Sequence, residues 1–169
     1  VTSRNVCELL NFIHKGNFTF TGIDLFLNDS EISADEYKPT NKFSNPFKEI
    51  YFKYILRINP YSIESVSKLL KKFKNNIEII QGNSNEVLKK IDVTKYDYVF
   101  LDGGHKYETV KKDLQLLKNV LNNNGLILCD DYNLTYAPGV KKAIDEFSKE
   151  NDFGLKIINS RFAEITKSK

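Results

Sequence analysis

Apolar segments of two kinds alternate along the chain. Short segments rich in β-branched and aromatic residues predict buried strands at 18–26, 77–82, 96–102 and 126–132. Segments with apolar residues at helical spacing predict helices at 5–13, 62–73, 85–91, 106–122 and from Pro138 onward. Two further strand-like segments, 154–160 and 162–167, close the chain. Strands and helices are therefore expected to alternate over most of the sequence.

Three of the predicted helices indicate how they start or which face they bury. Ser62 has the side chain of an N-cap for the helix that follows it. The helix at 106–122 carries one apolar stripe, made of Val110, Leu114, Leu117 and Leu121. The helix after Pro138 is expected to turn Val140, Ile144 and Phe147 inward.

The alternation also indicates the fold class. Near-continuously apolar strands joined by helices are typical of a doubly wound α/β domain, with a mostly parallel sheet covered by helices on both faces. At 169 residues, 41% of them hydrophobic, the chain is long enough to form one such domain over 1–169. The stretch at 27–60 is polar, punctuated by proline and long for a connection, so we predict a functional insert there.

Composition narrows the classes of partner. The net charge is only +3, and lysine and arginine are scattered among carboxylates, which argues against a nucleic-acid binder. Cys7 and Cys129 lie far apart without metal-ligand spacing, and a reduced cytoplasmic environment explains them most simply. The sequence shows neither a secretory signal nor an apolar run of membrane-spanning length. We therefore expect a cytoplasmic protein that binds neither nucleic acid nor a membrane, and a homo-oligomer remains open.

Polar residues follow four of the predicted strands, at the point where each strand ends. They are Asp24, the triplet Gly82-Asn83-Ser84, Asp102 with His105, and the pair Asp130-Asp131. In open α/β sheets, ligands bind beyond the carboxyl ends of the strands. The repetition predicts a ligand site along this edge.

Each of these residues also has a structural interpretation. Asp24 can simply cap the segment that follows it, and His105 can be an ordinary residue at a helix start. Adjacent Asp130 and Asp131 are harder to explain in this way, because two neighbouring carboxylates repel each other unless a cation or a hydrogen-bond donor compensates. This favours a functional role for at least one of the two.

A longer motif joins several of these features. The sequence reads "YDYVFLDGGHKYETVKKDLQLLKNVLNNNGLILCDDY" from residue 96 and continues with "PGVKKAIDEF" from Pro138. It resembles the class I S-adenosylmethionine-dependent methyltransferases, in the branch with a D-G-x-H turn and a D-D-Y strand end. That branch includes macrocin-type and rhamnosyl-type O-methyltransferases and cephalosporin-hydroxylase-like proteins. The resemblance is specific over 77–147, extends back to "TGIDLF", and fades over 27–60 and near the end of the chain.

The resemblance implies a Rossmann-like methyltransferase fold that binds S-adenosylmethionine. Asp24 resembles the acidic residue that binds the cofactor ribose through both hydroxyls. Gly82, Asn83 and Ser84 fall where the family holds the adenine, although an aspartate is commoner at the position of Asn83. Asp102 is also expected to contact the cofactor.

The resemblance further implies a magnesium-assisted reaction. Asp102, Asp130 and Asp131 resemble carboxylates that hold a divalent cation, and an all-oxygen set suits Mg²⁺. His105 resembles a proposed general base, so His105 and Asp102 are the predicted catalytic residues. The implied reaction transfers a methyl group to an oxygen of a small hydroxylated substrate, with a sugar as one candidate.

One part of the family pattern is missing. The family has a glycine-rich turn after its first strand, and this sequence has none; residues 1–10 resemble the helix just after that turn. Thr2 or Ser3 is then expected at the cap of that helix, with Ser3 at the cofactor. We expect the first strand and its turn to lie upstream of Val1, which would make the domain incomplete at its N-terminus. The alternative is a non-catalytic binding or scaffold domain that has lost the cofactor loop.

Overall fold

A computed structural model describes residues 2–26 and 62–168, so the predicted insert at 27–60 lies outside the described residues. The contacts within the chain divide it into two compact units. Among the described residues, unit 1 comprises 2–26 and 62–83, and unit 2 comprises 84–168. Within the described ranges, no helix is both long and apolar enough to cross a bilayer.

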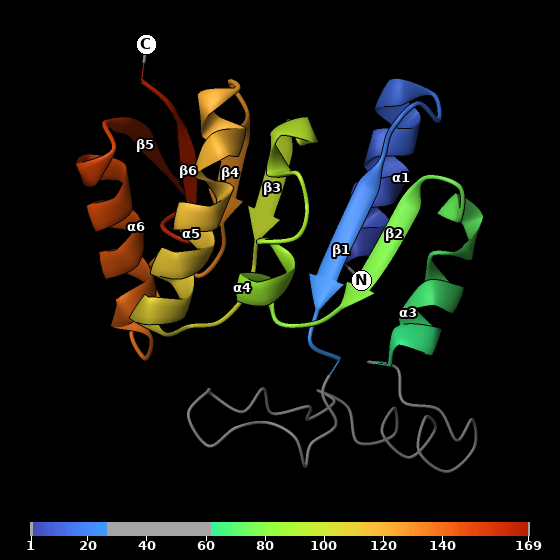
Figure 1. Cartoon of the computed structure of the whole chain (residues 1–169), viewed down its shortest axis with the longest axis horizontal. Coiled ribbons are helices and arrows are strands. Elements are labelled where there is room, and N and C mark those ends of the chain that lie inside the picture. Colours follow the sequence, from blue (N-terminus) through green and yellow to red (C-terminus); the bar gives the residue numbers. More distant parts are fainter. Residues whose placement is uncertain (1, 27–61, 169) are drawn as a thin grey trace. The chain divides into compact units, whose positions relative to one another are not determined.

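Unit 1 is built on a pair of parallel strands (Figure 1). Its elements are α1 (Thr2–His14), β1 (Phe20–Asp24), α3 (Ile63–Leu69), the 3-10 turn η2 (Lys71–Phe73) and β2 (Ile77–Gln81). In the parallel register Asp24 lies opposite Gln81, so both strands end at the same edge. The core of the unit is formed by Cys7, Leu70 and Phe73. The predicted N-cap is confirmed, because the Ser62 side chain accepts a hydrogen bond from the Ser65 amide at 3.2 Å.

Unit 2 contains a four-stranded mixed sheet in the order β3-β4-β6-β5. Its elements are α4 (Ser84–Val87), η3 (Val93–Lys95), β3 (Tyr98–Leu101), α5 (Tyr107–Asn122), β4 (Leu126–Cys129), α6 (Pro138–Glu150), β5 (Phe153–Ile158) and β6 (Phe162–Lys167). Strands β3 and β4 are parallel, as the alternation of strands and helices predicts. Strand β6 runs antiparallel to both β4 and β5, so the chain ends in a hairpin.

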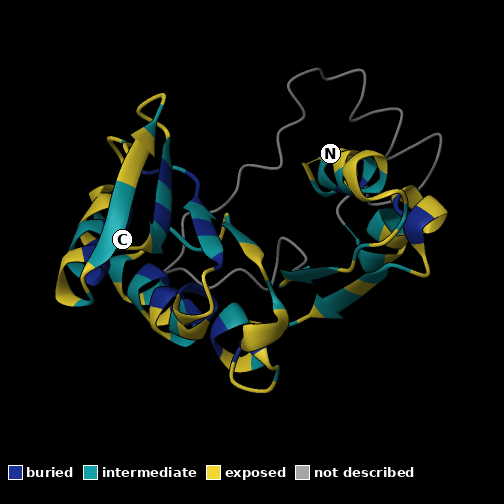
Figure 2. Ribbon diagram, turned by 90° about the horizontal axis from the view of Figure 1, so that it is seen from above, coloured by how far each residue is buried: buried dark blue, intermediate teal, exposed yellow. Residues whose placement is uncertain are grey.

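The core of unit 2 lies between the sheet and its two long helices. Helices α5 and α6 lie side by side on one face of the sheet (Figure 1). Every residue of the predicted stripe on α5 is buried, and so are Val140, Ile144 and Phe147 on α6. Burial alternates along β4, where Ile127 and Cys129 are buried and their neighbours only partly so (dark blue and teal in Figure 2). The two predicted helix faces are therefore confirmed.

The hairpin between β5 and β6 brings its turn to the end of β4. Asn159 and Ser160 both have left-handed backbones, with φ of 50° and 56°. The turn closes through a hydrogen bond from the Arg161 amide to the Ile158 carbonyl at 3.1 Å. The Tyr132 amide, three residues beyond β4, donates to the Arg161 carbonyl at 2.8 Å. These two bonds fix the backbone of Arg161 beside the strand end.

Candidate active site

A pocket lies at the carboxyl ends of β3 and β4. Leu101 and Cys129 are register partners, and the Asp130 amide donates to the Leu101 carbonyl at 2.9 Å, so the two strands end together. The polar lining consists of Asp102, Gly103, Gly104, His105, Asp130 and Asp131. The apolar lining consists of Leu101, Val110, Cys129 and Val140. The fold thus brings together the residues that the sequence places at these two strand ends.

His105 and Asp131 form a pair at the pocket. Nε2 of His105 lies 3.0 Å from Oδ2 of Asp131, and the two side chains are 29% and 22% exposed. Asp131 has a left-handed backbone with φ of 60°, which is uncommon for a residue with a side chain. A carboxylate beside Nε2 keeps the proton of a neutral imidazole on that nitrogen, and Nδ1 is then the nitrogen that accepts a proton.

Asp130 is held by an arginine from the hairpin turn. Nε and Nη2 of Arg161 donate to its two carboxylate oxygens at 2.6 and 2.7 Å, while Asp130 itself is only 7% exposed. Burial raises the pKa of the Asp130 carboxyl, but the bonds from Arg161 and from the Asp131 amide outweigh burial and leave this pKa below its ordinary value. Asp130 is therefore an ionised, bidentately bound carboxylate.

The sequence requires a compensating group for the adjacent aspartates but does not identify it. Arg161 lies 31 positions beyond Asp130, in a turn. Its Nη2 is also 3.9 Å from Oδ1 of Asp131. The hydrogen bonds to Asp130, and then the negative charge of that carboxylate, raise the pKa of the Arg161 guanidinium. The repulsion expected between Asp130 and Asp131 is thus relieved by Arg161 on one side and by the imidazole of His105 on the other.

Asp102 directly follows β3, which ends at Leu101, and is exposed. The pKa of its carboxyl is raised, first because the group is partly desolvated against the protein and next because the charges of Asp130 and Asp131 lie close. The negative charges of Asp130 and Asp131 therefore both act on the Asp102 carboxyl.

The three carboxylates do not fit the predicted magnesium site as they are arranged. Within residues 2–26 and 62–168, no group of three His, Cys, Asp or Glu side chains is placed to hold a metal ion. The physical reason lies in the contacts, since both oxygens of Asp130 accept from Arg161 and one oxygen of Asp131 faces His105. A divalent cation needs these same oxygens as ligands.

The predicted ribose ligand, Asp24, lies at the end of β1 in unit 1 and is exposed. Its Oδ1 accepts a hydrogen bond from the Phe26 amide at 2.8 Å, and its backbone carbonyl accepts from the Gly82 amide at 2.9 Å. Asn83 follows Gly82 and is also exposed. One prediction needs correction: Ser3 lies inside α1, which begins at Thr2, so neither residue stands outside the helix as a cap.

Ser84 is the first residue of α4 and belongs to unit 2. Its hydroxyl donates to Oδ2 of Asp113 at 3.0 Å, and the Asn85 side-chain amide donates to the other oxygen of the same carboxylate. Asp113 is 1% exposed and was not among the predicted site residues. Its position, three residues after Val110 on the buried stripe of α5, is a signal that the sequence contains. This carboxylate fixes the start of α4 directly after Gly82 and Asn83.

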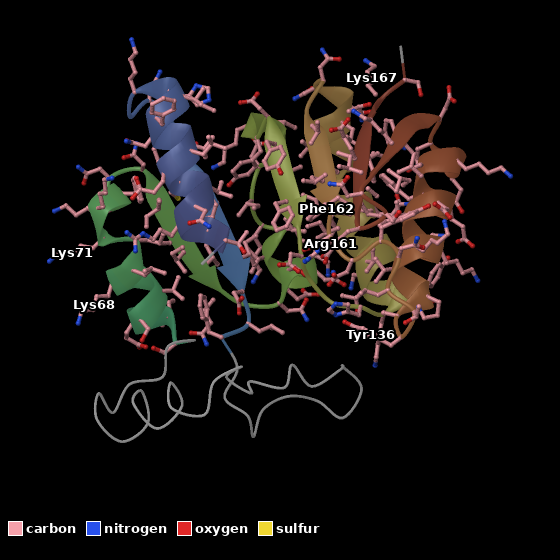
Figure 3. The ribbon with its side chains drawn as sticks, turned by 180° about the vertical axis from the view of Figure 1, so that it is seen from behind. Lys68, Lys71, Tyr136, Arg161, Phe162 and Lys167 are labelled. Carbon is pink, nitrogen blue, oxygen red and sulfur yellow. The ribbon has the colours of Figure 1, made fainter. Side chains whose placement is uncertain are left out.

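Tyr136 is a second residue that the sequence does not single out. It lies between β4 and α6, and its ring centroid is 6.4 Å from that of His105. Tyr136 is 53% exposed. It is labelled in Figure 3. An aromatic surface therefore stands beside the predicted base and is open to solvent.

The family model described as "Methyltransferase domain" matches residues 7–132 of this chain. The chain belongs to that family. The comparison with curated proteins gave no match.

Solved structures show the same fold at low sequence identity. The O-methyltransferase NovP aligns with a TM-score of 0.57 and 17% identity, over 95% of this chain and 64% of its own. The TDP-rhamnose 3'-O-methyltransferase CalS11 aligns with a TM-score of 0.56 and 16% identity, over 95% of this chain and 65% of its own. The chain thus spans less than two thirds of either protein. These similarities confirm the predicted Rossmann-like methyltransferase fold.

Proposed function

We propose that this protein transfers a methyl group from S-adenosylmethionine to a hydroxyl oxygen of a small, sugar-like acceptor. The observation that carries the proposal is the His105–Asp131 pair, which lies at the carboxyl edge of the sheet in a chain of the methyltransferase-domain family. NovP is an O-methyltransferase and CalS11 methylates TDP-rhamnose at oxygen, which supports oxygen as the acceptor atom. The proposed acceptor is a small molecule and not a nucleic acid.

Methyl transfer needs a base that removes the acceptor proton. It also needs the acceptor oxygen, the methyl carbon and the sulfur to be aligned. Nδ1 of His105 takes the proton of the acceptor hydroxyl while Asp131 holds the opposite ring nitrogen and stabilises the imidazolium that forms. The acceptor oxygen then forms a bond to the methyl carbon, and the carbon–sulfur bond breaks with its electron pair going to sulfur. The products are a methyl ether, S-adenosylhomocysteine and a protonated His105. The family resemblance also predicts magnesium, but the carboxylates do not fit it as arranged, so no step passes through a metal ion.

The first prediction concerns the cofactor ribose. Asp24→Ala should weaken S-adenosylmethionine binding by about 1.5 to 3 kcal/mol, the range for hydrogen bonds to a charged group. Isothermal titration calorimetry measures this change directly. Glu78→Ala removes an exposed carboxylate from the middle of β2 and should leave the affinity unchanged. Equal affinities for Asp24→Ala and wild type would remove Asp24 from the ribose site.

The second prediction concerns the acceptor. The exposed Tyr136 ring offers an apolar surface on which the face of a sugar ring can pack. Tyr136→Ala should raise the KM for the acceptor about tenfold, as expected for losing one aromatic contact of about 1 to 1.5 kcal/mol, and leave cofactor affinity unchanged. The assay is methyl transfer to a panel of hydroxylated acceptors that includes TDP-rhamnose.

Tyr98 provides a matched control for that assay. It is 48% exposed but stands at the start of β3, the end of the strand away from the pocket. Tyr98→Ala should therefore leave the KM for the acceptor unchanged. If the two alanine variants raise this KM equally, Tyr136 has no special role in acceptor binding.

A further inference from the structure

We propose that Arg161 is the resident cation of this site, and that its guanidinium takes the position on Asp130 that a divalent metal would need. On this basis Arg161 is a positioning residue for the His105–Asp131 pair. The inference rests on the proposed function for its catalytic meaning, whereas the cation assignment itself concerns only contacts among residues of unit 2.

The guanidinium is engaged more completely than an ordinary surface arginine. It donates to both oxygens of Asp130, at 2.6 and 2.7 Å, and lies 5.1 Å from the ring centroid of Phe162. The fork geometry of a bidentate arginine–carboxylate pair gives it strength and a fixed direction. Although the Arg161 side chain is 60% exposed, the Asp130 side chain is 6% exposed, so the pair is shielded on the carboxylate side.

Backbone hydrogen bonds also fix the position of Arg161. Its amide donates to the Ile158 carbonyl and its carbonyl accepts from the Tyr132 amide, within a turn whose two left-handed residues precede it. Two consecutive left-handed residues define a tight hairpin turn with few alternatives. The guanidinium is therefore held beside the pocket before any ligand arrives.

A continuous chain of contacts leads from Arg161 to the base. Arg161 fixes Asp130, and Oδ1 of Asp130 also accepts from the Asp131 amide at 2.7 Å. That bond supports the left-handed backbone of Asp131, whose Oδ2 faces His105 Nε2 at 3.0 Å. Arg161 thus supplies positive charge to two adjacent carboxylates and determines where the second one points.

The test is Mn²⁺ binding by the whole protein after removal of metals, followed by electron paramagnetic resonance of free Mn²⁺. Mn²⁺ takes the same oxygen ligands as Mg²⁺. Wild type should show no saturable site at these carboxylates. Arg161→Met should gain one, with affinity at least about tenfold above wild type, because a competing unit charge leaves the carboxylate. Adding Asp130→Asn to Arg161→Met should abolish the gained site.

Two further variants serve as controls for the Mn²⁺ titration. Arg4→Met removes an exposed arginine from α1 and should bind Mn²⁺ as wild type does. Arg161→Lys retains the charge, so it should gain less Mn²⁺ binding than Arg161→Met. A saturable site in wild type that Asp130→Asn removes would overturn the proposal. A folded Arg161→Met protein with no added binding would overturn it as well.

The positioning role has its own readout in the imidazole nitrogens. The sequence has only two histidines, so His14→Ala identifies the ¹⁵N signals of His105. In wild type these signals should report the tautomer with its proton on Nε2, and in Arg161→Met that preference should be lost. An unchanged tautomer would remove the positioning role. A wild type that binds neither Mn²⁺ nor S-adenosylmethionine would support the cation assignment and reject the proposed function, so the two failures are distinguishable.

Discussion

Replacing His105 with alanine is expected to slow methyl transfer by roughly 10²- to 10⁴-fold, the usual contribution of a general base. The imidazole lines the pocket and is paired with Asp131, and no other histidine lies in unit 2. Cofactor affinity should be nearly unchanged, because His105 is not among the residues predicted to contact the cofactor. The measurement combines single-turnover rates with a calorimetric titration of S-adenosylmethionine.

His14 gives the matched control for this substitution, since it is exposed in the last turn of α1. His14→Ala should transfer methyl groups at the wild-type rate. Asp131→Asn should slow transfer as well, and the double variant with His105→Ala should be no slower than His105→Ala alone, because the two residues act as one unit. Wild-type turnover by His105→Ala would make the histidine a helix-start residue and leave deprotonation to another group.

The second large effect is expected in the core of unit 2. Phe147→Ala should lower the free energy of unfolding by about 3 to 5 kcal/mol, the cost of removing a buried aromatic ring and leaving a cavity. Phe147 is 0% exposed on α6, and its ring centroid lies 5.6 Å from that of Phe153 on β5. Urea unfolding followed by circular dichroism measures the change.

Phe12 offers the same substitution in the opposite environment. It is 82% exposed on α1, so Phe12→Ala should change the free energy of unfolding by no more than about 0.5 kcal/mol. If Phe147→Ala costs as little as Phe12→Ala, the packing of α6 against the hairpin is not as described.

The order of elements follows from local sequence, and so does the buried face of the long helices. The stripe of Val110, Leu114, Leu117 and Leu121 is buried because helical spacing alone decides which side chains share a face. The sequence predicts the ends of the strands less precisely than the buried faces of the helices. The segment predicted as 96–102 forms a strand only over Tyr98–Leu101, because Asp102 leaves the ladder and enters the pocket.

The pairing of the last two strands could not be predicted from the sequence alone. Apolar patterns at 154–160 and 162–167 predict strands but carry no direction, and the antiparallel hairpin depends on the left-handed Asn159 and Ser160. Without that turn, nothing in the sequence places Arg161 next to Asp130. The need for a compensating charge follows from two adjacent carboxylates, whereas its source is a long-range contact that the fold alone supplies.

The predicted site residues are divided between the two units. Asp102, His105, Asp130 and Asp131 belong to one unit and line one pocket. Asp24, Gly82 and Asn83 belong to the other unit, so their union with the pocket in a single cofactor site remains a prediction. Membership in the methyltransferase-domain family is the reason to expect it.

Calorimetric titration of the protein with S-adenosylmethionine tests the central claim most directly. We predict saturable binding of one cofactor per chain, weakened by Asp24→Ala, unaffected by Glu78→Ala and nearly unaffected by His105→Ala. S-adenosylhomocysteine, which keeps the ribose and adenine, should compete for the same site. A folded protein that binds neither compound at millimolar concentration would contradict the account, and would identify the chain as a non-catalytic domain with a methyltransferase fold.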